Sequence, residues 1–256
     1  MNLYDNVAGN YRFLSGIAPY SAGVVAMPGY EIVRATLHTL LPWRAGFALI
    51  DRHLAALDRP RQALCGVELR LPKPLSFQGF GNFNAGYRSL LVEWEILLGD
   101  LNPVARTNIA PQVNPPGEPS LYAFSYTVPL TGPSNQQQPT FVVAGAGDLR
   151  DQAQLTPAAV VRPGESSPAA LREKAATVMA VMQERVAGLG VSPAQLTAVN
   201  VYTTYPLQSF LESEILAGFG VAATHGLHWH YSHPPIADLA FEMDVRGLRC
   251  ELWVNS

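Results

Sequence analysis

One polar segment divides this chain almost in half, and the order of secondary structure on its two sides most constrains the fold. Residues 131–139, TGPSNQQQP, are rich in polar and turn-forming residues and contain no large apolar side chain. Such a composition is typical of a linker. The chain has 256 residues, enough for one large domain or for two of ordinary size. Residues 1–130 and 140–256 can therefore be two domains, and an internal repeat would support that division.

The second half predicts a clear series of elements. Ser167 and Pro168 are a typical N-cap and first helical residue, and apolar residues at helical spacing continue until Gly188 and Gly190 end the helix. Runs rich in β-branched residues predict strands before and after this helix, and a shorter helix lies between the later strands. The predicted strands are residues 140–148, 158–164, 194–207, 226–233 and 239–252, and the short helix is 207–220.

The first half gives a looser copy of the same order. Its two predicted helices, residues 43–57 and 80–94, alternate with strands as in the second half. A β-β-α-β-α-β-β order that occurs twice predicts an α+β fold with two tandem domains, each a mixed sheet with two helices on one face. The predicted strands are residues 11–16, 23–37, 63–74, 102–113 and 121–130.

Composition and charge disfavour several classes of function. The chain is 48% hydrophobic and 14% charged, and its lysines and arginines are scattered at a net charge of -3. A nucleic-acid binder needs clustered cations instead. The sequence contains no run of about 18 apolar residues to span a membrane, and its N-terminus does not resemble a signal peptide. We therefore expect a cytoplasmic protein with no nucleic-acid or membrane partner. Cys65 and Cys250 predict neither a disulfide framework nor a thiolate zinc site.

Four of the six histidines fall in the stretch ATHGLHWHYSHPP, residues 223–235. Strand alternation places His228 and His230 on one face, with His225 before them and His233 just before a bend at Pro234. Such imidazoles could bind zinc, line a pocket or serve the structure alone. A zinc site also needs a ligand that converges from elsewhere in the chain. We therefore expect pocket-lining histidines, with no metal and no cofactor.

Arg106 and Glu242 are the charged residues best suited to chemistry on a carboxylate. Arg106 offers a planar fork of donors that stays charged at neutral pH and suits bidentate capture of a carboxylate. Glu242 and Asp244 lie two residues apart, so they share one face of a strand, and mutual repulsion would raise one pKa toward the range of a general acid or base. An ordinary ion pair and a solvated strand face remain the alternatives for the arginine and for the two acids.

Several motifs in order resemble the YjgF/RidA superfamily of imine and enamine deaminases. They are FLSG at 13–16, FNAGY at 83–87, PVARTNIA at 103–110, VVAGAGD at 142–148, VNVYTT at 199–204 and AFEMDV at 240–245. The resemblance covers nearly the whole chain and implies two RidA-like domains of the chorismate-mutase-like fold. Members of this superfamily are usually homotrimers whose pockets lie between subunits, so a homotrimer is expected here.

The resemblance also implies roles for particular residues. Arg106 takes the position of the arginine that binds the substrate carboxylate, and Glu242 takes that of the glutamate that orients or activates water. Asn84 and Tyr87 take polar positions on the helix before the arginine, and Ser15 takes a strand-end position beside the pocket.

The two halves depart from the family pattern in complementary ways. The first half keeps Arg106 but has aromatic residues, among them Tyr126, where its terminal acid should lie. The second half keeps Glu242 but lacks the arginine, and His225 lies within one residue of the vacated position. We therefore predict Glu242 and His225 as catalytic, and His228, His230 and Tyr126 as further substrate-binding residues beside Arg106.

These residues predict an enzyme that acts on C–N bonds other than peptide bonds. The favoured function is a hydrolase of the imine or enamine deaminase type that acts on a small unsaturated or aromatic-derived carboxylate. One alternative is a lyase or hydrolase on a cyclic enol-ether acid, as in the two-repeat chorismate-cleaving relatives. Another is a non-catalytic metabolite-binding trimer. Release of ammonia, release of pyruvate and binding without turnover would separate the three.

Overall fold

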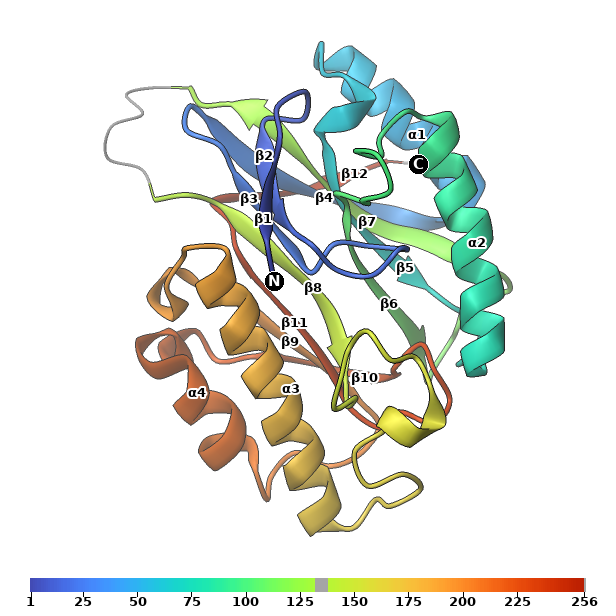
Figure 1. Cartoon of the computed structure of the whole chain (residues 1–256), viewed down its shortest axis with the longest axis vertical. Helices are drawn as coiled ribbons and strands as arrows, with labels where there is room; N and C mark the ends of the chain where they lie inside the picture. Colours follow the sequence, from blue (N-terminus) through green and yellow to red (C-terminus); the bar gives the residue numbers. More distant parts are fainter. Residues whose placement is uncertain (132–137, 256) are drawn as a thin grey trace.

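All strands of the protein lie in one mixed sheet, in a computed structural model that describes residues 1–131 and 138–255 (Figure 1). The sheet has 12 strands in the order β1-β2-β3-β8-β11-β9-β10-β6-β5-β7-β4-β12. The predicted α+β class is confirmed. Most of the predicted linker 131–139 lies outside the described residues.

The two halves of the chain repeat one topology. In each half the fourth strand lies between the first and the second, which gives the orders β4-β7-β5-β6 and β8-β11-β9-β10. The third strands, β6 and β10, join the halves as a short antiparallel pair. The elements of the first half are β4 (Tyr30–Pro42), α1 (Trp43–Ala56), β5 (Leu64–Arg70), α2 (Phe77–Glu93), β6 (Ala105–Pro111) and β7 (Ser120–Pro129). Those of the second half are β8 (Phe141–Gly147), α3 (Pro168–Gly188), β9 (Ala198–Thr203), α4 (Ala217–Phe219), β10 (His228–His233) and β11 (Glu242–Gly247).

The ends of the chain cross between the halves. At the N-terminus, β1 (Leu3–Asn6), β2 (Tyr11–Leu14) and β3 (Gly23–Ala26) extend the sheet of the second half, because β3 pairs with β8. At the C-terminus, β12 (Cys250–Val254) pairs in parallel with β4 of the first half. The prediction of one strand over 239–252 is therefore wrong. β11 already has a neighbour on each edge, and the chain leaves it to cover the open edge of β4.

Helices cover one face of each half, as the sequence predicts. Figure 1 shows α1 and α2 on one flank of the molecule, and α3 and α4 on the other. Ser167 caps α3 by accepting a hydrogen bond from the backbone N–H of Ala170, with Pro168 at the first helical position. The predicted helix 207–220 is a short π-helix, Leu211–Leu216, followed by α4. Three apolar clusters fill the spaces under α1 and α2, under α3 and α4, and around β2 and β3.

The predicted strand over 158–164 is wrong. Pro157–Ala159 forms a turn of 3-10 helix, and Val160 makes only an isolated bridge to Leu149. Arg162 then adopts a positive φ of 46° before Pro163, which has no N–H to donate. These backbone constraints prevent an extended ladder, and the apolar residues pack as a short loop against the end of β8.

A buried ion pair fixes the start of β11. Lys174 on α3 donates to Asp148 at 2.7 Å and to the carbonyl of Val161, and both charged side chains are almost fully buried. The other carboxylate oxygen of Asp148 accepts the backbone N–H groups of Ala240 and Phe241, at 2.9 and 3.1 Å. These bonds anchor the chain directly before Glu242, the first residue of β11.

We predict that Lys174→Ala lowers the free energy of unfolding by about 3–5 kcal/mol, because it leaves the Asp148 carboxylate buried without its counterion. Urea unfolding followed by circular dichroism measures the change. Lys73→Ala, at an exposed position, is the matched control and should change stability by less than about 0.5 kcal/mol. A loss at Lys174 no larger than at Lys73 would show that this ion pair does not anchor β11.

Candidate active site

The two halves meet in a small cavity where β6, β8 and β11 approach one another. Arg106 and Asn108 reach it from β6, Glu242 from β11, and Gly145 from β8. Its volume is about 20 Å³, enough for one water molecule. A second cavity of about 280 Å³ adjoins it, since Tyr20 lines both. The structure thus brings together one charged residue from each half.

Arg106 is held inside a cage of aromatic rings. The centre of its guanidinium lies 4.5 Å from the ring centroid of Tyr87 and 5.0 Å from that of Tyr20, and its side chain is buried. Its Nη2 donates to Oδ1 of Asn84 at 2.5 Å, whereas its Nη1 is buried without a partner among the described residues. Burial lowers the pKa of Arg106, which the aromatic hydroxyls and Glu242 partly oppose, yet an arginine remains cationic at neutral pH. The unpaired Nη1 is thus a charged donor available to an anion.

Glu242 contributes a buried carboxyl group to the same cavity. No protein group within residues 1–131 and 138–255 makes a hydrogen bond to this carboxyl. Burial raises its pKa well above the usual value near 4.5, and the nearby Asp244 raises it further, against the opposing charges of Arg185 and Arg106. The raised pKa favours the protonated form of Glu242, which can donate a proton.

Arg185 is a second cation of the site, and it was not among the residues predicted from the sequence. It lies on α3, is only 3% exposed, and donates through Nη1 to the carbonyls of Ala144 at 2.8 Å and Gly145 at 3.3 Å. Its Nε is buried without a partner in the described chain, and its side chain lines the larger cavity. The sequence does indicate that Arg185 is buried, because Arg185 lies on the apolar stripe of the helix, three residues after Met182.

The remaining predicted residues divide between this site and other places. Asn84 and Tyr87 contact Arg106, and Ser15 lines the larger cavity. His225 ends a 3-10 segment, Gly220–His225, and lines none of the cavities described here. Tyr126 is buried in the core of the first half, with its ring 4.9 Å from that of His53.

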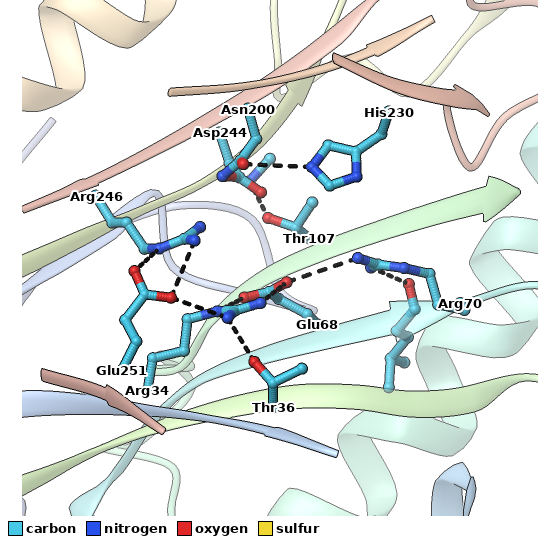
Figure 2. Close-up of polar contacts among 12 residues, drawn as sticks. Arg34, Thr36, Glu68, Arg70, Thr107, Asn200, His230, Asp244, Arg246 and Glu251 are labelled. Carbon is cyan, nitrogen blue, oxygen red and sulfur yellow. Dashed lines mark hydrogen bonds and ion pairs between the residues drawn. The ribbon is translucent and has the colours of Figure 1, made fainter. Parts of the chain in front are cut away.

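His228 and His230 line a different cavity. Figure 2 shows His230 in a region of arginines and carboxylates. His233 contacts Gln112 across the pair of β10 and β6, with Nε2 2.5 Å from Oε1.

No cluster of three His, Cys, Asp or Glu side chains that could hold a metal is found in the described part of the chain. Within these same residues, no helix is long and apolar enough to cross a membrane.

A family model and a sequence relative, both of aminomuconate deaminases, match nearly the whole chain. The family model of the 2-aminomuconate deaminase CnbZ matches residues 3–252. A 2-amino-5-chloromuconate deaminase of Comamonas testosteroni is 40% identical over 239 residues, which cover 93% of this chain and 94% of that protein. Among solved structures, a crystal structure of chorismatase matches 88% of this chain and 77% of its own at 12% identity, with a TM-score of 0.45.

We predict that Gly145→Ala disrupts the site, because a β-carbon at this position would collide with Oε1 of Glu242 and press on Thr107. Buried side-chain atoms of Glu242 and Thr107 surround the position closely, so the cost is about 1–3 kcal/mol of unfolding free energy. Thermal unfolding checks this, with Gly117→Ala as the control because nothing lies within 4 Å of its added carbon. Equal Tm values for the two variants would contradict the close packing described here.

We also predict that Glu242→Gln stabilises the protein, and more so as the pH rises. The folded pKa of Glu242 is raised, so between about pH 4.5 and the folded pKa the carboxyl is protonated in the folded protein but ionised in the unfolded chain. Its contribution to stability therefore falls as pH rises from that value toward the folded pKa, and glutamine lacks this titration. The Tm difference between variant and wild type should be larger at pH 8 than at pH 4. A pH-independent difference would mean that Glu242 is ionised when folded.

Proposed function

The chain belongs to the 2-aminomuconate deaminase family, and from this membership we propose that it removes ammonia by hydrolysis from a 2-aminomuconate-type dicarboxylate. It is an enzyme that acts on C–N bonds. We propose the cavity between Arg106, Arg185 and Glu242 as its active site.

One observation carries this assignment: two buried arginines with unpaired donors flank a single buried acid. A 2-aminomuconate has a carboxylate at each end of a conjugated chain and an amino group beside one of them. Arg106 can hold one carboxylate through Nη1, and Arg185 can hold the other through Nε. Arg106 lines one cavity with Tyr20 and Glu242, and Arg185 lines the adjoining cavity with Tyr20. The two cations match the two charges of the substrate.

The reaction begins with tautomerisation of the enamine to an imine. A proton moves from nitrogen to carbon in the enamine, which gives a C=N double bond beside the carboxylate. Water then adds to this carbon: the C–O bond forms, the second bond of C=N breaks, and Glu242 gives its proton to nitrogen. The Glu242 carboxylate so formed accepts a proton from the added water.

Loss of ammonia completes the reaction. The C–N bond of the tetrahedral intermediate breaks as the carbonyl forms, and nitrogen leaves with the proton it needs from Glu242 while the hydroxyl proton returns to that carboxylate. Water and imine thus become a keto acid and ammonia, with Glu242 restored to its neutral form. Burial raises the pKa of this acid and favours its protonated form, which supports its role as the proton donor.

We propose that the two halves are RidA-like domains, residues 1–130 and 140–256, and that the protein forms a homotrimer. The repeated strand order and the placement of Arg106 and Glu242 support the first proposal. Exposed aromatic residues on β10 and β12, Trp229, Tyr231 and Trp253, support the second, because large exposed apolar side chains often mark interfaces. Light scattering coupled to gel filtration would give the mass of a trimer or that of a monomer.

We predict that substitution of the two arginines and of Glu242 separates binding from chemistry. Arg106→Gln and Arg185→Gln should each lower kcat/KM for 2-aminomuconate by about 10- to 100-fold, because each removes a charge-assisted hydrogen bond. Glu242→Gln should lower kcat by about 100-fold or more with little change in KM, because it cannot donate a proton. Ammonia release measures the reaction, and pyruvate release tests the alternative enol-ether chemistry.

Arg172→Gln is the matched control, since Arg172 lies on the same helix as Arg185 but at an exposed position. It should keep full activity. Wild-type kcat/KM in both Arg106→Gln and Arg185→Gln would overturn the proposed site.

A further inference from the structure

A third cavity, of about 250 Å³, lies among strands of both halves and is lined by several charged side chains, which Figure 2 shows. Its lining includes Arg34 from β4, Arg70 from β5 and Arg246 from β11, together with Glu68 and Glu251. The three arginines are all at most 8% exposed. Nothing in the deamination chemistry uses this cavity, so its purpose needs a separate explanation.

Two of the three arginines are fully paired with carboxylates. Arg34 makes a bidentate pair with Glu68, at 2.5 and 2.9 Å, and also reaches Glu251 at 3.0 Å. Arg246 makes a bidentate pair with Glu251, at 2.8 and 3.2 Å. Burial would raise the pKa of Glu68, but the charge and hydrogen bonds of Arg34 outweigh burial and lower it to about 2. Both glutamates are thus ionised, and each already forms ion pairs with Arg34 or Arg246.

Arg70 has no such partner. Its Nη2 lies 3.8 Å from Glu68, beyond hydrogen-bond distance, and its Nη1 donates only to the carbonyl of Leu69 at 3.3 Å. Its guanidinium instead stacks on the ring of Tyr122, with 3.7 Å from Cζ to the centroid. A buried cation without a hydrogen-bonded anion is costly, so this arrangement favours an anion from outside the chain.

The balance of charges around the cavity favours the binding of one anion. Asp244 lies behind the cavity with both oxygens occupied, by Asn200 at 2.6 Å and Tyr202 at 2.8 Å. Burial and the charge of Glu68 raise its pKa. The lining of the cavity itself carries three arginines against two glutamates. Burial, followed by the charge of Arg70, lowers the pKa of His230 to about 4, so this imidazole is neutral at pH 7.

The remaining lining suits a planar organic acid. Tyr122 stacks on Arg70, and His230 stacks on Tyr202 with 4.8 Å between ring centroids. Flat π surfaces of this kind favour conjugated or aromatic groups. We propose that this cavity is a second ligand site, which binds a small planar carboxylate by pairing it with Arg70.

The two sites are joined by β11. Glu242 belongs to the deaminase site, whereas Asp244 and Arg246 lie beside the Arg70 cavity, and residues two apart share one face of a strand. A carboxylate bound at Arg70 would therefore place its charge on the same face of β11 as the proposed proton donor. The second site does not depend on the role of Arg106, so the two assignments can fail separately.

Benzoate serves as the test ligand, and isothermal titration calorimetry measures its affinity. We expect Arg70→Gln to weaken benzoate binding at least tenfold, and Arg70→Lys to weaken it less because the charge is kept. Arg106→Gln should leave a binding event of unchanged affinity, because it empties only the deaminase site. Inorganic phosphate, tested in parallel, should bind more weakly than benzoate.

A stability measurement guards against a misfolded variant. If the charge of Arg70 is compensated only by a bound ligand, Arg70→Met removes an uncompensated charge. The Tm of the ligand-free protein then stays equal or rises. If Arg70 is only a structural cation, Arg70→Met lowers the Tm. The proposal is overturned by a lowered Tm together with unchanged benzoate affinity in Arg70→Gln, by absence of benzoate binding to the wild type, or by tighter binding of phosphate.

Discussion

The absence of a side chain at Gly145 lets three parts of the chain meet. Its backbone N–H donates to Oγ1 of Thr107 at 3.0 Å, which ties β8 of the second half to β6 of the first. Its carbonyl accepts from Arg185 on α3, and the carboxyl of Glu242 lies over its α-carbon. A larger residue would separate the halves and displace the acid. The distance between the proposed acid and the two arginines therefore depends on this backbone contact.

The proposed site takes its arginine from one half of the chain and its acid from the other. Arg106 belongs to the first half and Glu242 to the second, and the repeated strand order brings them to one cavity. The same order places Asp244 and Arg246 in the second charged region of the molecule, so one strand serves two groups of polar residues. The burial that raises the pKa of Glu242 also lowers the stability of the folded protein as the pH rises, a cost consistent with a functional group.

Much of the fold could be predicted from the sequence, because local patterns determine it. The cap at Ser167 and the apolar stripe of α3 are confirmed, and one strand order occurs in both halves, although the strand predicted over 158–164 is absent from the structure. The pairing of β12 with β4 could not be predicted, since it depends on which strand edge remains open. Arg185 and Arg70 were missed for a similar reason. A charged residue in an apolar stripe or a strand does not reveal whether its partner is protein, solvent or ligand.

In the proposed site one dicarboxylate lies between Arg106 and Arg185, with Glu242 beside the carbon chain of the ligand. A crystal structure of the wild-type protein with muconate, which lacks the amino group and cannot lose ammonia, tests this directly. We expect one carboxylate of muconate within hydrogen-bond distance of Nη1 of Arg106, and the other within hydrogen-bond distance of Nε of Arg185. Muconate bound elsewhere, with both of these donors still unpaired, would contradict it.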